Sequence, residues 1–110
     1  MGIKSLVLEA QAIVEALGLR AVISPNDINP PCVLIGSPRF NLQNAVGAGL
    51  RAEIPVEVIA RGLTWRDLEW LYDTAPLVAD ALSAVGGEPT VFRMSDGREL
   101  PGYTIMLEGN

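Results

Sequence analysis

The side chains that carry most enzyme chemistry are scarce in this sequence. Its 110 residues include no histidine, a single cysteine and a single lysine. Without histidine, the Ser-His-Asp and Cys-His pairs of hydrolases, the zincin motif and histidine-ligated iron or copper sites cannot form. One cysteine excludes an intramolecular disulfide and any multi-cysteine metal site. We therefore expect a protein that is not an enzyme, with no catalytic residue, no metal site and no cofactor.

Two glutamates are the best remaining candidates for paired-carboxylate chemistry. Glu53 and Glu57 share one face of a predicted strand, where four residues at about 3.3 Å each separate their Cα atoms by roughly 13 Å. That separation is too large for either the retaining or the inverting glycosidase geometry. We interpret the pair as an acidic stripe that faces solvent or a neighbouring subunit.

Two further candidates have simpler structural explanations. Gly47-Ala48-Gly49 is not followed by the Lys-Ser or Lys-Thr pair and the helix that a phosphate-binding loop requires, so we expect a hairpin loop. Cys32 lies in an apolar run without a charged sequence neighbour, so nothing in its sequence surroundings lowers the pKa of its thiol. We interpret it as an ordinary buried side chain.

The composition is that of one folded domain covering residues 1–110. Apolar residues make up 49% of the chain and charged residues 19%, with a net charge of -5, which is a globular balance. The acidic excess disfavours nucleic-acid binding, which depends on Lys and Arg. We find no secretory signal and no apolar run long enough to cross a bilayer. We expect a soluble protein made in a reducing cytosol, without a membrane partner.

The first half of the chain predicts a helix followed by strands. Apolar residues at three-four spacing over 3–17 predict an amphipathic helix that Gly18 ends. Strands are predicted over 19–23 and over 32–36, and the second is apolar on both faces, as expected of a central strand. A short polar strand and a loop are predicted over 40–49. Over 50–60 the even positions are apolar, and Pro55 predicts an edge strand or a bulge.

The second half predicts a long helix and a hairpin. Thr64 is the predicted N-cap, Trp65 belongs to the apolar face, and Gly86-Gly87 ends the helix. Pro76 is expected to kink this helix or to break it in two. Strands over 89–94 and 103–107 flank Asp96-Gly97, a pair suited to a type I′ turn. The predicted fold is α+β, with the order α-β-β-β-β-α-β-β and two helices packed on a mostly antiparallel sheet.

Several polar side chains are candidates for contacts with other proteins. Trp70 lies on the opposite helix face from Trp65, and either anchors an interface or is partly covered by a neighbouring loop. The arginines beside the central strands could pair with carboxylates of a second copy, although ordinary surface charge explains each of them singly. The candidate interface with a second copy or with another protein consists of Arg39, Asn41, Gln43, Asn44, Arg51, Glu53, Glu57, Arg61 and Trp70, and Arg66 is a further arginine of this kind.

One stretch of the sequence resembles a known family. The segment 29–38, NPPCVLIGSP, is similar to a stretch in small neck proteins of long-tailed bacteriophages (siphoviruses), especially those that infect actinobacteria. The segment 56–60, the helix over 67–82 and the segment 100–105 follow the order of elements in that family. The chain thus resembles the tail terminators, and the resemblance spans nearly its whole length.

The resemblance implies a structural protein of the virion, assembled in the host cytoplasm and located in the neck of the tail. Tail terminators form a homohexameric ring that caps the tail tube, ends its polymerisation and joins it to the head-tail connector or stopper. DNA is expected to pass through the ring without specific binding. Two alternatives remain open at this point: another neck, connector or minor tail component, and a small cytosolic ligand-binding module. The latter requires a well-formed pocket with a perturbed carboxyl group.

Overall fold

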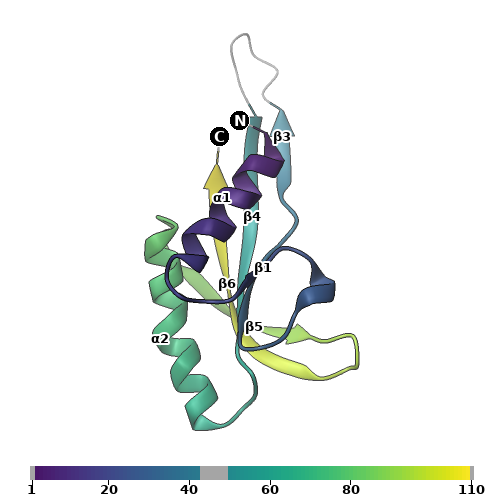
Figure 1. The fold of residues 1–110 in the computed structure, drawn as a ribbon, viewed down its shortest axis with the longest axis vertical. Coiled ribbons are helices and arrows are strands. Elements are labelled where there is room, and N and C mark those ends of the chain that lie inside the picture. Colours follow the sequence, from purple (N-terminus) through teal and green to yellow (C-terminus); the bar gives the residue numbers. More distant parts are fainter. Residues whose placement is uncertain (1, 43–49, 110) are drawn as a thin grey trace.

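The structure is a computed structural model that describes residues 2–42 and 50–109. The predicted order of helices and strands is confirmed, and a short 3-10 turn is added to it (Figure 1). The elements are α1 (Ile3–Glu15), β1 (Ala21–Val22), the 3-10 turn η1 (Pro25–Asp27), β2 (Cys32–Ile35), β3 (Arg39–Leu42), β4 (Leu50–Ile59), α2 (Trp65–Ala81), β5 (Gly87–Arg93) and β6 (Glu99–Gly109). The chain has an α+β fold.

The strands form a six-stranded sheet in the order β1-β2-β4-β6-β5, with β3 also paired to β4. All pairs are antiparallel except β1 with β2. Strand β6 occupies one edge of β4 over residues 52–59. Strands β2 and β3 therefore share the other edge, β2 beside residues 56–59 and β3 beside residues 50–53. Both helices lie on the same side of this sheet (Figure 1).

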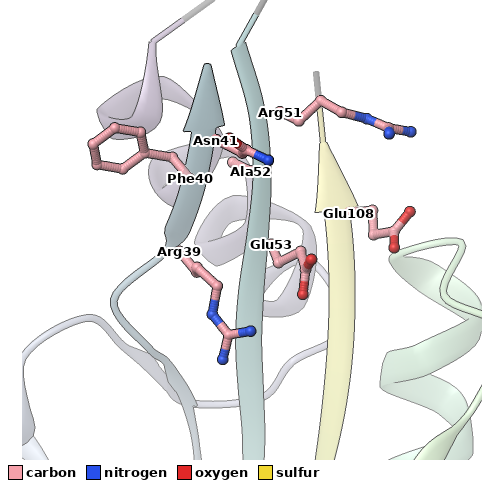
Figure 2. Close-up of a pocket in the computed structure, with 7 residues that line it drawn as sticks. All are labelled: Arg39, Phe40, Asn41, Arg51, Ala52, Glu53 and Glu108. Atoms are coloured by element: carbon pink, nitrogen blue, oxygen red, sulfur yellow. The ribbon is translucent and has the colours of Figure 1, made fainter. Parts of the chain in front are cut away.

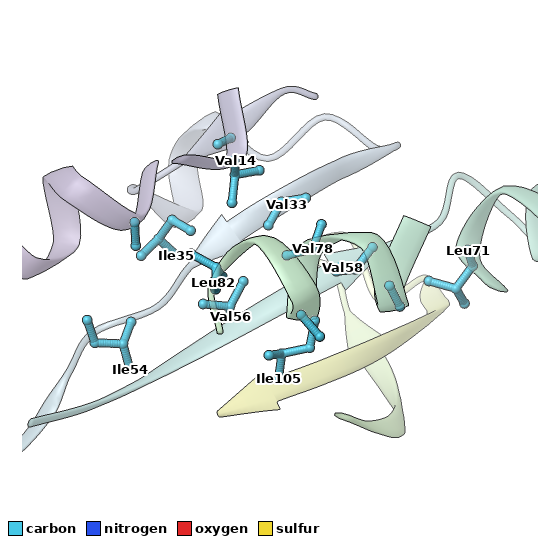
Figure 3. Close-up of a cluster of buried hydrophobic side chains, with 14 of the residues drawn as sticks. Val14, Val33, Ile35, Ile54, Val56, Val58, Leu71, Val78, Leu82 and Ile105 are labelled. Atoms are coloured by element: carbon cyan, nitrogen blue, oxygen red, sulfur yellow. The ribbon is translucent and has the colours of Figure 1, made fainter. Parts of the chain in front are cut away.

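The predicted alternation in β4 is confirmed and explains the main core. Ile54, Val56 and Val58 of β4 are buried against α1 and α2, whereas Glu53, Pro55 and Glu57 lie on the other face and are half-buried. We call the helix-covered side the inner face and the opposite side the outer face. The inner-face core consists mainly of aliphatic side chains from both helices and from β2, β4 and β6, among them Val14, Val33, Ile35, Ile54, Val56, Val58, Leu71, Val78, Leu82 and Ile105 (Figure 3).

A second, smaller apolar cluster covers one end of the outer face. It contains Val22, Cys32, Leu34, Ile59 and Leu100, with Ile28, Phe92 and Met94 packed against them. These covering residues come from the turn after η1 and from the β5-β6 hairpin. Strand β2 is therefore buried on both faces, as its uninterrupted apolar sequence predicts.

The prediction that Pro55 marks an edge strand is wrong, because β4 is the central strand of the sheet. Pro55 lies where β2 has ended at Ile35 and β3 has not yet begun at Arg39. Its carbonyl accepts a hydrogen bond of 2.8 Å from the amide of Gly36. A Cβ at Gly36 would come within 2.9 Å of the Pro55 ring, so the connection between β2 and β3 needs glycine here. The missing amide of a proline is tolerated at such an interruption in the ladder.

The start of α2 is confirmed, but its interior and its end differ from the prediction. Thr64 is the N-cap, and its hydroxyl oxygen accepts a hydrogen bond from the amide of Asp67. The helix is not broken at Pro76; that side chain is exposed, so the Tyr72 carbonyl that loses its donor lies on the solvent side. The helix ends at Ala81, before Gly86, and Ser83 adopts a positive φ of 58° just after it.

The C-terminal hairpin is confirmed, but its turn is not of type I′. A type I′ turn needs positive φ at both central residues. Gly97 has a φ of 92°, but the φ of Asp96 is not positive. The amide of Gly97 donates to the Met94 carbonyl, and the amide of Met94 donates to the Arg98 carbonyl. This is the longer hairpin loop in which glycine takes the left-handed position after a type I turn. Strand β6 also begins earlier than predicted, at Glu99.

Candidate functional site

The end of the sheet that carries β3 has an open groove of about 430 Å³ on its surface. The groove is lined by residues of three adjacent strands: Arg39, Phe40, Asn41, Arg51, Ala52, Glu53 and Glu108 (Figure 2). Four of these, Arg39, Asn41, Arg51 and Glu53, belong to the interface predicted from the sequence. The fold thus brings together polar residues that are separated in sequence, on strands β3 and β4.

The charged side chains of this groove stand in rows across the outer face. In the pairing register, Arg39 of β3 lies opposite Glu53 of β4, and Glu53 lies opposite Glu108 of β6. The order across the sheet is therefore one positive and two negative charges (Figure 2). Among the described residues, neither Arg39 nor Arg51 forms an ion pair within 4.0 Å. Two like charges directly opposite each other destabilise a strand pair, so this row is electrostatically unbalanced within one chain.

Three residues of the groove were not predicted from the sequence: Phe40, Ala52 and Glu108. Glu108 joins the site only through the register of β6 with β4, which the sequence alone does not fix. Phe40 lies between two polar neighbours in sequence and is 55% exposed. In Figure 2 its ring points away from the charged side chains of the groove, because neighbouring residues of a strand alternate between faces. The sequence signal for this residue is a phenylalanine between two polar residues in a predicted polar strand.

The remaining predicted interface residues do not join the groove. Gln43 and Asn44 lie outside the described residues. Glu57 is on the outer face of β4, between Leu34 of β2 and Thr104 of β6. Partial burial there raises the pKa of the Glu57 carboxyl above its ordinary value of 4.5. Glu57 lies four residues farther along β4 than Glu53, a spacing larger than either glycosidase geometry requires.

Arg61 and Trp70 lie at the other end of the molecule, near the start of α2. Arg61 Nη2 is 3.4 Å from Asp67 Oδ1, and the Thr64 hydroxyl donates a hydrogen bond of 2.8 Å to Asp67 Oδ2. Arg61 therefore has a partner in its own chain. Trp70 is half-buried and shares a shallow surface groove of about 160 Å³ with Pro31, which confirms the alternative of partial cover by a loop. Arg66 lines the same groove.

The prediction that Trp65 belongs to the core is wrong. Trp65 is 67% exposed, and its ring meets that of Tyr72 edge to face with centroids 6.2 Å apart. The ring of Tyr72 in turn meets that of Tyr103 of β6 edge to face, with centroids 6.4 Å apart. The buried stripe of α2 runs along Leu71, Ala75, Val78 and Leu82, and Trp65 lies to one side of it, in the first turn. Trp65 and Trp70 thus flank the stripe on opposite sides, and the Pro31 loop covers Trp70.

A second open groove, of about 510 Å³, lies between α2 and the strands β5 and β6. Its lining is largely apolar and includes Tyr72, Pro76, Val85 and Tyr103. Tyr72 is 46% exposed and Val85 is fully exposed. A third groove, of about 370 Å³, separates α1 from the end of α2 and is lined in part by Leu6, Ile13 and Leu107. The surface therefore carries apolar recesses beside α2 and a charged recess beside β3.

Cys32 is buried in the outer-face cluster beside Ile59. Burial raises the pKa of its thiol, and this outweighs the smaller opposing effects of a hydrogen bond from Asn29 and the charge of Arg20. The thiol is therefore protonated and shielded at neutral pH, as expected for a structural cysteine.

Comparison with models of known protein families and with curated proteins finds no match to this sequence. Within residues 2–42 and 50–109, no helix is both long enough and apolar enough to cross a membrane.

Proposed function

We propose that this chain is a structural subunit of a phage tail, of the tail-terminator type, which assembles into a homohexameric ring. The ring caps the tail tube, ends its polymerisation and joins it to the head-tail connector. It works in the neck of the virion after assembly in the host cytoplasm. The proposal assigns the chain no catalytic activity and no cofactor, and its mechanism is geometric.

The observation that carries this proposal is the difference between the two sides of the molecule. One sheet edge, at β3, bears exposed charges and the exposed ring of Phe40. The region of α2 and β5 bears an exposed aromatic pair and an apolar groove. A subunit with several unlike surface patches can contact different partners, including further copies of itself, through different patches. Such patches permit head-to-tail contacts, which close into a ring when the rotation between copies allows it.

The exposed aromatic side chains also favour an assembling protein over a monomer. Trp and Tyr are enriched at protein interfaces, where they bury a large area at a small cost in conformational entropy. Trp65 and Tyr72 contact each other at the surface, and both are more than 40% exposed. A chain of 110 residues has little reason to expose a tryptophan and a tyrosine together unless another protein covers them.

The charge of the outer face fits a DNA channel. Glu53, Glu57 and Glu108 lie on this face, and Glu88 of β5 lies in the same row as Glu57, beyond Thr104. These four carboxylates outnumber Arg39 and Arg51 of the same face. If this face lines the ring, carboxylates repel the phosphates of the passing DNA. Proteins that hold DNA do so with Lys and Arg, so an acidic wall lets DNA slide without binding.

The ligand-binding alternative finds less support. It requires a pocket that contains a carboxyl group with a perturbed pKa. The carboxyl group whose pKa burial raises is that of Glu57, and Glu57 lines none of the four grooves described above.

The test is tube capping. Tail tube protein is polymerised with and without this protein, and electron microscopy records tube lengths and tube ends. The proposal predicts that added protein shortens the tubes and appears as one ring at a tube end, whereas an unrelated acidic protein of similar size has no effect. Unchanged tube lengths with bare ends would contradict the proposal. Binding to the head connector, with no binding to tubes, would identify a different neck component.

A further inference from the structure

The sheet has two open edges at the end that carries β3. Pairing of β5 with β6 begins at Gly87 opposite Ile105, so residues 106–109 of β6 have β4 on one side and, among the described residues, no strand on the other. Strand β3 likewise pairs with β4 on one side, and no described strand lies on its other side. Open strand edges carry unpaired backbone amides and carbonyls that can pair with another chain.

The two open edges lie at the same level of the sheet and have compatible directions. Strand β3 pairs with residues 50–53 of β4, and residues 106–109 of β6 pair with residues 52–55. Both strands are antiparallel to β4 and are therefore parallel to each other (Figure 1). A second copy in the same orientation can thus place its β3 beside this β6 as a parallel pair.

The charges of the outer face favour this arrangement. Within one chain the row is Arg39, Glu53, Glu108, and Glu108 stands at the open edge with another carboxylate on its inner side. Addition of a second copy at this level puts the Arg39 of that copy next to Glu108. Each pair of glutamates then has an arginine on both sides, and the repulsion between Glu53 and Glu108 is compensated.

The inner face supports the same register. Phe40 shares a row with Ala52 and Gly109, and its side chain is 55% exposed. In the arrangement with Arg39 beside Glu108, the next residue, Phe40, comes to lie beside Gly109. An aromatic ring next to an edge glycine covers backbone that the glycine leaves bare. One register therefore pairs the charges on one face and covers the exposed phenylalanine on the other.

We infer that β3 of one copy adds to the open edge of β6, at residues 106–109, of the next copy, so that the sheet continues from subunit to subunit. This inference rests on the proposed ring, and it names the contact that closes it. Each copy donates β3 and accepts at β6. The contact is heterologous, as a ring requires.

The test uses two charge reversals, Arg39→Glu and Glu108→Arg, and native mass spectrometry across a range of concentrations. Each reversal places like charges at every contact, and we expect the concentration at which rings form to rise by about tenfold or more. When the two variants alternate in one ring, position 39 of each copy faces the opposite charge at position 108 of its neighbour, so mixing them restores the attraction at every contact. The mixture is therefore expected to form rings at wild-type concentrations, with equal numbers of the two variants.

The double variant R39E/E108R is expected to form rings alone and to exclude wild-type copies. Controls reverse the charges of Arg93 and Glu99, which pair at 3.2 Å in the distant hairpin; Arg93→Glu and Glu99→Arg should leave the ring-forming concentration unchanged. The inference would be overturned if either single edge variant formed rings at wild-type concentrations, or if the mixture stayed dissociated. In both cases the proposed function would still stand, provided that the wild-type protein forms rings. Wild-type protein that forms no ring, alone or on tail tubes, would overturn both.

Discussion

The two ends of the sheet differ in how completely their side chains are buried or paired and their strands are paired with other strands. At the closed end, five strands lie side by side, the helices cover the inner face, and an apolar cluster around Ile59 covers the outer face. At the open end the described strands are β3, β4 and β6, and charged side chains line the groove on the outer face. The closed end holds most of the buried core, whereas the open end holds backbone and charge that find no partner among the described residues.

In the proposed ring, this difference separates residues that stabilise the monomer from residues that form the contacts between copies. Substitutions at the closed end should lower the free energy of unfolding. Substitutions at the open end should leave that free energy nearly unchanged and act on the ring. The following substitutions test the distinction, beginning with the largest expected effect on stability.

Ile59→Ala should have the largest effect, because Ile59 is fully buried (0% exposed) in the outer-face cluster. Removal of a buried isoleucine side chain to alanine costs about 2–5 kcal/mol. Urea denaturation of the monomer measures this loss. Ile59→Val serves as the matched control and should cost about 0.5–1.5 kcal/mol. A loss for Ile59→Ala no greater than that of the valine control would show that the outer face is not a true core.

Thr64→Ala should have an intermediate effect. Thr64 caps α2 by accepting the amide of Asp67, and its hydroxyl donates to the Asp67 carboxylate. Loss of an N-cap costs about 1 kcal/mol, and the change also leaves the buried carboxylate with Arg61 alone. Thermal unfolding measures the loss, and Thr64→Ser, which keeps the hydroxyl, should retain most of the stability. Equal losses in both variants would argue against the cap.

Glu57→Gln should have a smaller, pH-dependent effect. Burial raises the pKa of Glu57 in the folded chain above its ordinary value of 4.5, so the folded state holds this proton more tightly than the unfolded state does. Wild-type stability therefore falls as pH rises from about the ordinary value through the folded pKa, and then levels off. Glutamine removes this loss, so the variant should be the more stable protein at pH 7 and should show no such advantage in acid. The effect of burial would be contradicted if the difference in denaturation midpoint between the two proteins were the same at every pH in this range.

Phe40→Ala should have the smallest effect on the monomer, within about 0.5 kcal/mol, as for most surface substitutions. Its ring is exposed and points away from the groove. Ring formation should nevertheless weaken, because the ring of Phe40 is expected to cover Gly109 of the next copy. Urea denaturation measured together with the ring-forming concentration separates the two effects. A loss of monomer stability as large as that of Ile59→Ala would erase the distinction between the two ends.

The sequence was sufficient for the order of elements, because each carries a local signal. The alternation over 50–60, the Thr64 cap and the glycine at position 18 each depend on nearby residues, and the structure confirms all three, with Gly18 at a φ of 84°. The uninterrupted apolar sequence of β2 also predicts its position inside the sheet, because a strand that is buried on both faces has no alternation of polar and apolar residues.

The predictions for Pro55 and Trp65 are wrong because segments that are distant in the sequence determine the surroundings of these residues. Pro55 is a local signal for an edge, yet the central β4 tolerates it because β2 has ended and β3 has not begun beside it. Trp65 and Trp70 cannot be distinguished by helical spacing alone. Trp70 is half-buried, because it packs against the inner-face core and shares a groove with Pro31, a residue about forty positions away in the chain. Trp65 is 67% exposed.

The candidate site was predictable only in part, for the same reason. The polar residues of β3 and β4 stand out in the sequence, since they follow a buried strand and surround a predicted hairpin. Glu108 and the open edge of β6 become visible only through strand register and sheet order. The row of Arg39, Glu53 and Glu108 is a property of three strands together, and no window of sequence contains it.

The most direct test of the central claim, that the chain assembles head to tail through two different edges, is native mass spectrometry of the wild-type protein over a wide range of concentrations. The account predicts a closed ring of six copies that appears without a populated dimer of fixed size. A dimer that stays a dimer at the highest concentrations, with or without tail tubes, would show a two-fold contact between identical surfaces and would contradict the account.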